Sequence, residues 1–344
     1  MGSRAPPPRI PVINFPPSGV LKPGTPEWES IKFQVVKALE EYGCFEALFN
    51  KVSLDLRKSV FSSLKELFDL PLERKMKNSS KKPFHGYHGK IPRMLPFESL
   101  GIDDAPVLEK VQGFTDILWP EGNPKFCRKS LDKAILRLES PYQIRPLLSQ
   151  TIQSYSEKLS ELDQIIRTMI VESYGVEKHF DELMDLTNHL LRVMKYNVDE
   201  TTTDGEAVGL LPHTDMNLLT ILCQNHVNGL AVQTKDGEWI DVIPSSVNSF
   251  TVFSGDAFHA WTNGRLHSPK HRVILKGNEA RYSAGLFAIP KSGHIIKAPE
   301  ELVDDEHPLL FKPYDHVKFL GYFYVESQDP DKIGISALKT YCGA

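Results

Sequence analysis

The second half of the chain contains seven short β-rich runs separated by tight turns, and this pattern constrains the fold more than any other feature. The turns include Asp236-Gly237, Gly255-Asp256 and Asn263-Gly264, whose residue types favour turn conformations. Seven short strands at this spacing are typical of a β-sandwich or a jelly roll. The runs are Leu218–Cys223, Gly229–Thr234, Trp239–Ile243, Ser249–Phe253, Phe258–Trp261, His271–Leu275 and Tyr282–Ile289.

The first half of the chain has mostly helical periodicity. Thr25-Pro26 provides an N-cap and a proline for the first helical position, and apolar residues recur at helical spacing behind this pair. The same spacing predicts a second helix over Leu54–Leu70 and a long amphipathic helix over Ile152–Tyr174. The remaining expectations are an edge strand over Ile10–Phe15, a weaker helix over Phe180–Leu190 and a coil over Asn78–Pro124.

No linker separates the helical segment from the β-rich segment, so we expect one composite domain over residues 1–344. In this interpretation residues 1–190 form a mainly helical part and residues 191–300 form the β core. Residues 301–344 then form a C-terminal tail with helices.

The composition excludes several classes of protein. The chain is 41% apolar, which is too hydrophobic for a disordered protein, and no apolar run reaches the roughly 18 residues of a membrane span. The 40 basic and 44 acidic residues nearly balance, without a basic block of nucleic-acid-binding size. The four cysteines are scattered, and no secretory leader is recognisable. We therefore expect a cytoplasmic protein with neither nucleic acid nor membrane as a partner.

A candidate metal site stands in the β-rich segment, at His213-Thr214-Asp215. Residues two apart in an extended segment share a face, so His213 and Asp215 point the same way. His271 opens another predicted strand 56 residues after Asp215. Two histidines and one carboxylate on one face leave coordination positions open, as in non-haem Fe(II) oxygenases. The same ligands also suit zinc in a hydrolase, and an isolated His-x-Asp is also consistent with a simple hydrogen-bonded pair.

A second polar pair follows ten residues after His271, at Arg281-Tyr282-Ser283. Arg281 and Ser283 share one face of a predicted strand, and the alternation continues to Phe287. A guanidinium binds a carboxylate through two hydrogen bonds, and a neighbouring hydroxyl adds a third. Burying an arginine is costly unless an anion meets it. The anion is either a dicarboxylic co-substrate or an internal aspartate or glutamate.

The three motifs His213-Thr214-Asp215, His271-Arg272-Val273 and Arg281-Tyr282-Ser283, in this order, resemble those of plant 2-oxoglutarate/Fe(II)-dependent dioxygenases. The similarity covers essentially the whole chain. The segments that further resemble the AOP-like branch, named for enzymes of glucosinolate metabolism, are Asp236–Ile240, Ala260–Pro269 and Lys339–Gly343.

The resemblance implies an α+β fold whose core is a double-stranded β-helix (jelly roll, cupin-like), with N-terminal and middle helices packed around it. It implies an oxidoreductase that uses Fe(II), 2-oxoglutarate and O2, with ascorbate as an additional reductant. The 2-oxoglutarate and O2 go to succinate and CO2. The substrate would be a small specialised metabolite such as a terpenoid, steroid, alkaloid or glucosinolate, and the outcome hydroxylation, desaturation or ring closure. We expect a monomer.

The family's functional residues carry over by position. Arg281 and Ser283 match the pair that binds the far carboxylate of 2-oxoglutarate, and Tyr196 corresponds to a tyrosine that often joins them. The residues that resemble the Fe(II) ligands are His213, Asp215 and His271.

Phe287 lies where a substrate-stacking aromatic is common, and family position also suggests Phe114 and Trp119 near the substrate. The chain departs from the family at Met194, where many members have asparagine, and over residues 128–149, which have no recognisable counterpart. Two other functions remain open, namely a zinc-dependent hydrolase and a catalytically silent binding protein on the same fold. Arg281 with Ser283 argues against the hydrolase, since hydrolysis needs no dicarboxylate-binding pair.

Overall fold

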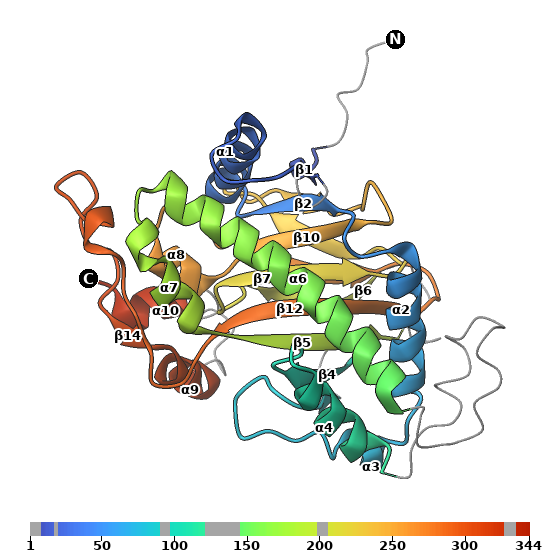
Figure 1. Cartoon of the computed structure of the whole chain (residues 1–344). Coiled ribbons are helices and arrows are strands. Elements are labelled where there is room, and N and C mark those ends of the chain that lie inside the picture. Colours follow the sequence, from blue (N-terminus) through green and yellow to red (C-terminus); the bar gives the residue numbers. More distant parts are fainter. Residues whose placement is uncertain (1–7, 17–19, 90–96, 121–144, 198–205, 327–334) are drawn as a thin grey trace.

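The computed structural model describes residues 8–16, 20–89, 97–120, 145–197, 206–326 and 335–344 (Figure 1). Two sheets form the centre of the fold. The larger has eight strands in the order β1-β2-β10-β7-β12-β5-β4-β3, and the smaller has four in the order β6-β11-β8-β9. The larger sheet contains β1 (Val12–Phe15), β2 (Cys44–Phe49), β3 (His88–Gly89), β4 (Phe97–Asp103), β5 (Thr187–Tyr196), β7 (Leu219–Gln224), β10 (Ser249–Ser254) and β12 (Arg281–Pro290). The smaller sheet contains β6 (Ala207–His213), β8 (Leu230–Gln233), β9 (Trp239–Asp241) and β11 (His271–Leu275).

The two sheets pack face to face. Tyr196 of the larger sheet lies in one buried cluster with Val273 of the smaller sheet, and Phe253 lies in another with Val232. All strand pairs within these two sheets are antiparallel except β1 with β2. The predicted jelly-roll core is confirmed.

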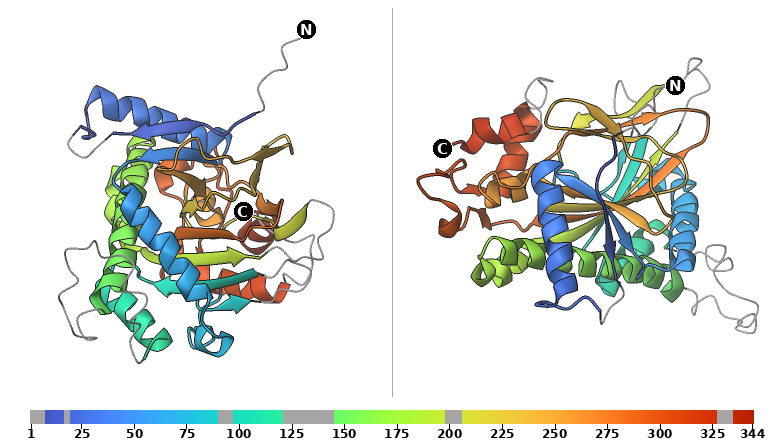
Figure 2. Two further views of the ribbon diagram at one scale, coloured as in Figure 1. Left: turned by 90° about the vertical axis from the view of Figure 1, so that its right-hand side faces the viewer. Right: turned by 90° about the horizontal axis from the view of Figure 1, so that it is seen from above.

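Helices cover the outer face of the larger sheet (Figures 1 and 2). The longest, α6 (Arg145–Ser173), crosses this face and packs against α1 (Pro26–Glu41), α2 (Leu54–Phe68) and α4 (Leu108–Leu118). The predicted apolar stripe of α6 is fully buried and consists of Leu159, Leu162, Ile166 and Met169. The remaining helices are α3 (Leu72–Lys75), α7 (Phe180–Asp185), α8 (Asp256–Trp261), α9 (His316–Glu326) and α10 (Ile335–Cys342), with short 3-10 turns at Glu177–His179 and Glu300–Leu302. A small third sheet pairs β13 (Ile295–Ile296) with β14 (Tyr314–Asp315).

Local signals in the sequence account for the helix starts. The Thr25 hydroxyl accepts a hydrogen bond from the Trp28 main-chain N–H at 3.3 Å, and Pro26 follows at the first helical position, as predicted. Ser53 caps α2 in the same way through the Leu56 N–H at 3.1 Å. Each cap satisfies an N–H group that has no partner within its own helix.

Two sequence predictions were wrong in type, and a third was wrong in where the element ends. Phe258–Trp261 belongs to helix α8, not to a strand, because a short apolar run does not by itself distinguish a buried strand from a buried helix. The region expected as coil, 78–124, contains β3, β4 and α4. The predicted helix over Phe180–Leu190 ends at Asp185, and β5 begins at Thr187.

Strands from both halves of the chain share the larger sheet. The early strand β2 pairs with β10, and β4 pairs with β5, which in turn pairs with β12. The expected boundary at residue 190 falls inside β5. Most of residues 128–149, the stretch without a recognisable family counterpart, lies outside the described residues. Its last residue, Ser149, is buried in α6 within hydrogen-bond distance of Thr115.

None of the helices in the described ranges combines the length and the hydrophobicity that a bilayer crossing requires.

A buried ion pair joins the helical layer to the sheet. Arg167 of α6 is fully buried, contacts the Asp163 carboxylate and donates to the Thr187 hydroxyl of β5 at 2.9 Å. His189 lies 2.9 Å from the same carboxylate. Burial alone would raise the pKa of Asp163, but Arg167 and His189 outweigh this effect and hold it below its usual value.

We predict that Arg167→Met lowers the free energy of unfolding by about 3 kcal/mol at neutral pH, because it leaves a buried carboxylate with one partner fewer. Urea unfolding measures this change. The matched control is Lys37→Met, which removes an exposed ion pair with Glu41 and should change stability by less than about 0.5 kcal/mol. Equal effects of the two substitutions would contradict the prediction.

Candidate metal and 2-oxoglutarate site

Strand pairing brings the three predicted metal ligands together. His271, at the start of β11, lies directly opposite His213, at the end of β6, and their ring centroids are 4.2 Å apart. The Asp215 Oδ1 atom lies 3.8 Å from His213 Nε2 and 3.6 Å from His271 Nε2. One ligand atom from each residue lies within 4.8 Å of the others, and this is the one such cluster among the residues the structure describes. Their positions suit one ion with several open coordination positions.

Hydrogen bonds behind the cluster orient its ligand atoms. The Nδ1 atom of His213 lies 2.8 Å from the Leu211 carbonyl, and that of His271 lies 3.3 Å from the Pro269 carbonyl. Both rings thereby turn Nε2 toward Asp215. The Thr220 hydroxyl donates to Asp215 Oδ2 at 2.6 Å and leaves Oδ1 free to face the histidines. Supports of this kind are usual behind metal ligands.

The electrostatics of the cluster also favour a cation. Enclosure between the sheets, and then the neighbouring His271, lower the pKa of His213 to about 4, although part of the ring remains exposed. His213 is therefore a neutral imidazole at physiological pH, which is the form that binds a metal.

Helix α8 holds the loop that carries Asp215. The Asp256 N–H donates to the Asp215 carbonyl at 2.7 Å, and the Asp256 carboxylate accepts from the hydroxyls of Thr214 at 2.9 Å and Ser268 at 2.7 Å. Burial raises the pKa of Asp256 to about 7. A Cβ atom at Gly255 would lie 2.2 Å from the Asn217 carbonyl oxygen, so the close approach of helix and loop requires glycine. Sequence reasoning missed this support, although Gly-Asp directly before an apolar run is a helix-start signal.

Arg281 and Ser283 lie side by side on the inner face of β12, and both are fully buried. Arg281 Nη1 lies 3.4 Å from Ser283 Oγ, and Nη2 donates to Gln224 Oε1 at 2.8 Å. Among the residues that the structure describes, the Arg281 Nε atom has no hydrogen-bond partner. Within the described parts of the chain no carboxylate forms an ion pair with this guanidinium, and burial lowers the Arg281 pKa. The internal acidic partner that the sequence left open is therefore absent from those parts.

Tyr196 pairs with Arg281 across β5 and β12, and the guanidinium carbon lies 5.2 Å from the centre of its ring. Met194 pairs in the same way with Ser283, and its sulfur lies 3.6 Å from the Tyr196 hydroxyl. Met194 thus occupies the inner face beside the cluster, where its thioether replaces the polar amide expected from the family.

Phe287 lies on the same face of β12 as Arg281 and pairs with Thr220, the residue that supports Asp215. Its side chain is half-buried and packs over Gly285, where a Cβ atom would lie 2.9 Å from the Phe287 ring. The aromatic ring therefore stands on the inner face near the metal-ligand loop.

Phe114 and Trp119 lie elsewhere. Both are buried in the core between the helices and the outer face of the larger sheet, and they line a small void with Val193. Val193 alternates along β5 with Met194, which faces the inside. The structure therefore corrects their assignment to the substrate by family position. The larger sheet separates Phe114 and Trp119 from the candidate metal ligands.

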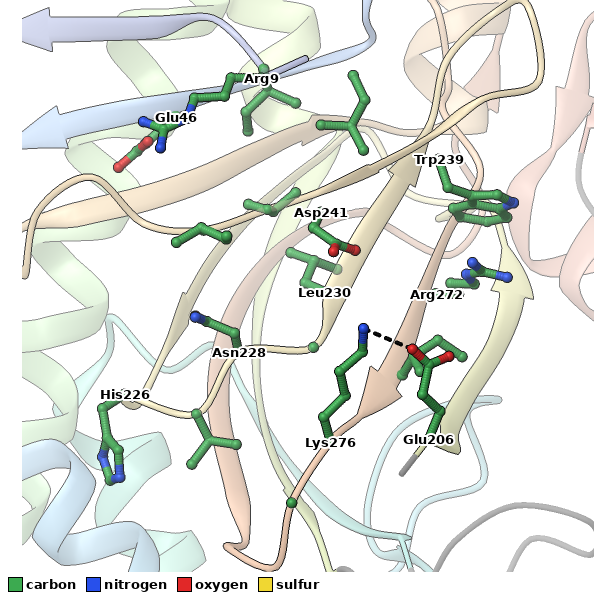
Figure 3. A pocket seen from close by; sticks show the side chains of 18 of the residues that line it. Arg9, Glu46, Glu206, His226, Asn228, Leu230, Trp239, Asp241, Arg272 and Lys276 are labelled. Atoms are coloured by element: carbon green, nitrogen blue, oxygen red, sulfur yellow. Dashed lines mark ion pairs between the residues drawn. The ribbon is translucent and has the colours of Figure 1, made fainter. Parts of the chain in front are cut away.

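A cavity of about 930 Å3 lies on the outer side of the smaller sheet (Figure 3). Arg272 contributes to it by stacking on Trp239, with 4.0 Å between the guanidinium carbon and the ring centre, and Lys276 pairs there with Glu206 at 2.7 Å. Arg272 follows His271 and so points away from the face of β11 that carries the metal ligand. The cavity is therefore separate from the candidate site.

Comparisons with known proteins agree with this geometry. The model of the 2OG-Fe(II) oxygenase superfamily matches residues 187–290, and a model described as non-haem dioxygenase in morphine synthesis N-terminal matches residues 10–93. The chain is 47% identical over 336 residues to probable 2-oxoglutarate-dependent dioxygenase AOP1.2 of Arabidopsis thaliana, covering 97% of this chain and 95% of that protein. It is 33% identical to the 2-oxoglutarate-dependent dioxygenase AOP3 of the same plant, covering 100% and 99%.

The crystal structure of the rice dioxygenase for auxin oxidation matches with a TM-score of 0.73 and 26% identity, covering 98% of this chain and 100% of that one. The chain therefore belongs to the 2OG-Fe(II) oxygenase superfamily. It is a 2-oxoglutarate-dependent dioxygenase of the AOP type, and hence an oxidoreductase.

We predict that Gly255→Ala weakens metal binding at least tenfold, because the added methyl group would push the Asp215 loop away from helix α8. Titration with Mn(II), followed by calorimetry, measures the affinity. Gly113→Ala is the matched control, since a Cβ atom there meets nothing within 4 Å. Unchanged Mn(II) affinity in Gly255→Ala would show that the loop does not depend on this contact.

Proposed function

We propose that His213, Asp215 and His271 hold Fe(II), and that Arg281 and Ser283 bind the far carboxylate of 2-oxoglutarate. The observation that carries this proposal is the buried Arg281. Within the described ranges of the chain its side-chain partners are neutral and its Nε atom lacks a partner. A dicarboxylate supplies the negative charge that a buried guanidinium requires. When bound, iron with 2-oxoglutarate and O2 supplies the oxidation of a C–H bond, while 2-oxoglutarate goes to succinate and CO2.

The protein's own side chains would bind and orient the reactants. Thr220 and the two backbone carbonyls behind the histidines fix the ligand atoms, and Tyr196 closes one side of the Arg281 guanidinium. Phe287 offers a half-buried aromatic surface for an apolar substrate. A zinc hydrolase would have no use for the Arg281 and Ser283 pair, so the geometry favours the oxygenase over this alternative.

The proposed substrate is a small specialised plant metabolite, such as a terpenoid, steroid, alkaloid or glucosinolate. The AOP names of the relatives and the auxin-oxidising rice dioxygenase support a small organic molecule. Hydroxylation, desaturation and ring closure are all compatible with this site. We further propose that the enzyme acts as a cytoplasmic monomer, and that ascorbate keeps its iron reduced.

Metal binding has a direct test. His213→Ala and Asp215→Ala should each abolish turnover and weaken Mn(II) binding at least tenfold, because each removes one of three ligands. His213 lies at the end of β6 and Asp215 in the loop behind it, and neither side chain is fully buried, so circular dichroism should show a retained fold. His226→Ala, which removes an exposed histidine paired with Glu279, should keep full activity. Full activity in His213→Ala would overturn the metal assignment.

Co-substrate binding is tested by anaerobic titration with Fe(II) and 2-oxoglutarate, which together give a weak visible absorption band when bound. We expect the band in the wild-type protein. In Arg281→Lys the apparent Kd for 2-oxoglutarate should rise about tenfold or more, because lysine keeps the charge but loses the paired N–H donors of the guanidinium. Arg272→Lys, on the opposite face of the smaller sheet, should behave as wild type. If the iron-loaded, folded wild type gives no band, the co-substrate assignment is wrong.

A further inference from the structure

Arg281 is held by a glutamine where a buried arginine would ordinarily find a carboxylate. Gln224 stands at the end of β7, paired with Ser283 across the sheet, and its side chain is buried. Its Oε1 atom accepts from Arg281 Nη2 at 2.8 Å. The amide orientation is determined by Arg281 itself, because a guanidinium has only donors and so faces the oxygen of the amide.

The other atoms of Gln224 are also fixed. Its Nε2 donates to the Asn228 Oδ1 atom at 3.0 Å, and its main-chain carbonyl accepts from the guanidinium of Arg57 on α2. Arg57 also contacts the sulfur of the neighbouring Cys223. The Gln224 side chain is therefore held at both ends of its amide, and the strand beneath it is tied to the helical layer.

We propose that Gln224 is the positioning residue for Arg281: it fixes the guanidinium for 2-oxoglutarate while leaving its positive charge unpaired. This inference rests on the proposed function of Arg281. A carboxylate at this position would form an ion pair that the far carboxylate of 2-oxoglutarate must displace. A neutral acceptor supplies one hydrogen bond without that competition, and it keeps the remaining donors aimed at the co-substrate.

The decisive variant is Gln224→Glu, which keeps the size of the side chain and adds the competing charge. Three quantities are measured on the full chain: the thermal midpoint without metal, the Kd for Mn(II), and the Kd for 2-oxoglutarate with Mn(II) bound. We expect an equal or higher thermal midpoint, an unchanged Mn(II) affinity, and a Kd for 2-oxoglutarate raised about tenfold or more. Gln233→Glu adds the same charge near the turn at Gly237 and should leave all three near wild type.

A merely structural role for Gln224 gives a different result. It predicts that stability, Mn(II) affinity and 2-oxoglutarate affinity fall together in Gln224→Glu, and this outcome overturns the inference, as does an unchanged 2-oxoglutarate affinity. If Gln224→Glu does not fold, Gln224→Met replaces it. We expect that variant to raise the Kd for 2-oxoglutarate about threefold with Mn(II) affinity retained, because the guanidinium loses its orienting acceptor. An unchanged Kd in Gln224→Met overturns the inference.

Arg281→Lys separates this inference from the proposed function. If Arg281→Lys weakens 2-oxoglutarate binding and the Gln224 variants do not, the inference alone is wrong. If Arg281→Lys binds 2-oxoglutarate as tightly as wild type, the proposed role of Arg281 fails and the inference fails with it.

Discussion

The burial of the Arg281 guanidinium, without an acidic partner among the residues that the structure describes, is the constraint on which the candidate site depends. A buried, unpaired charge is costly, so the surrounding structure must supply hydrogen bonds and rigid packing. Three strands do so: β12 carries Arg281 with Ser283, β7 contributes Gln224, and β5 contributes Tyr196. Helix α6 and its neighbouring helices cover the outer face of these strands, so the sheet that carries Arg281 is packed on both of its faces.

The metal end of the site depends on a different kind of support. The two candidate histidine ligands come from the ends of two paired strands, whereas Asp215 lies in a loop that is held by the start of α8. Backbone N–H groups and the buried Asp256 carboxylate replace the missing strand partners. This arrangement holds the candidate ligands from behind through hydrogen bonds of the kind that supports metal ligands.

The sequence predicted those parts of the site that rest on local alternation. Arg281 and Ser283 lie two residues apart on one face of β12, as the spacing predicts. His213 ends β6 and Asp215 follows in the loop behind it, so these two residues come together near His271 without sharing a strand face. Helix starts at Thr25 and Ser53 follow equally from local capping chemistry. The position of Gln224 was not predictable, since its role depends on which strands lie side by side, and Gln224 on β7 is 57 residues from Arg281 on the neighbouring β12. The error over Phe114 has the same origin, because periodicity shows that a residue is buried but not which face of a sheet it meets.

One strand joins the two ends of the site. On the inner face of β7, Thr220 supports the Asp215 carboxylate and Gln224 supports the Arg281 guanidinium. Both of these supports are neutral, so β7 itself adds no charge beside the groups that would contact the reactants. With the proposed occupants, the two positive charges of iron and the one of Arg281 balance the one negative charge of Asp215 and the two of 2-oxoglutarate. An additional acid on this face of β7 would disturb that balance in a buried space with little water to screen it. Neutral supports on β7 therefore leave the charge of Asp215 available to the proposed metal ion and that of Arg281 available to the proposed dicarboxylate.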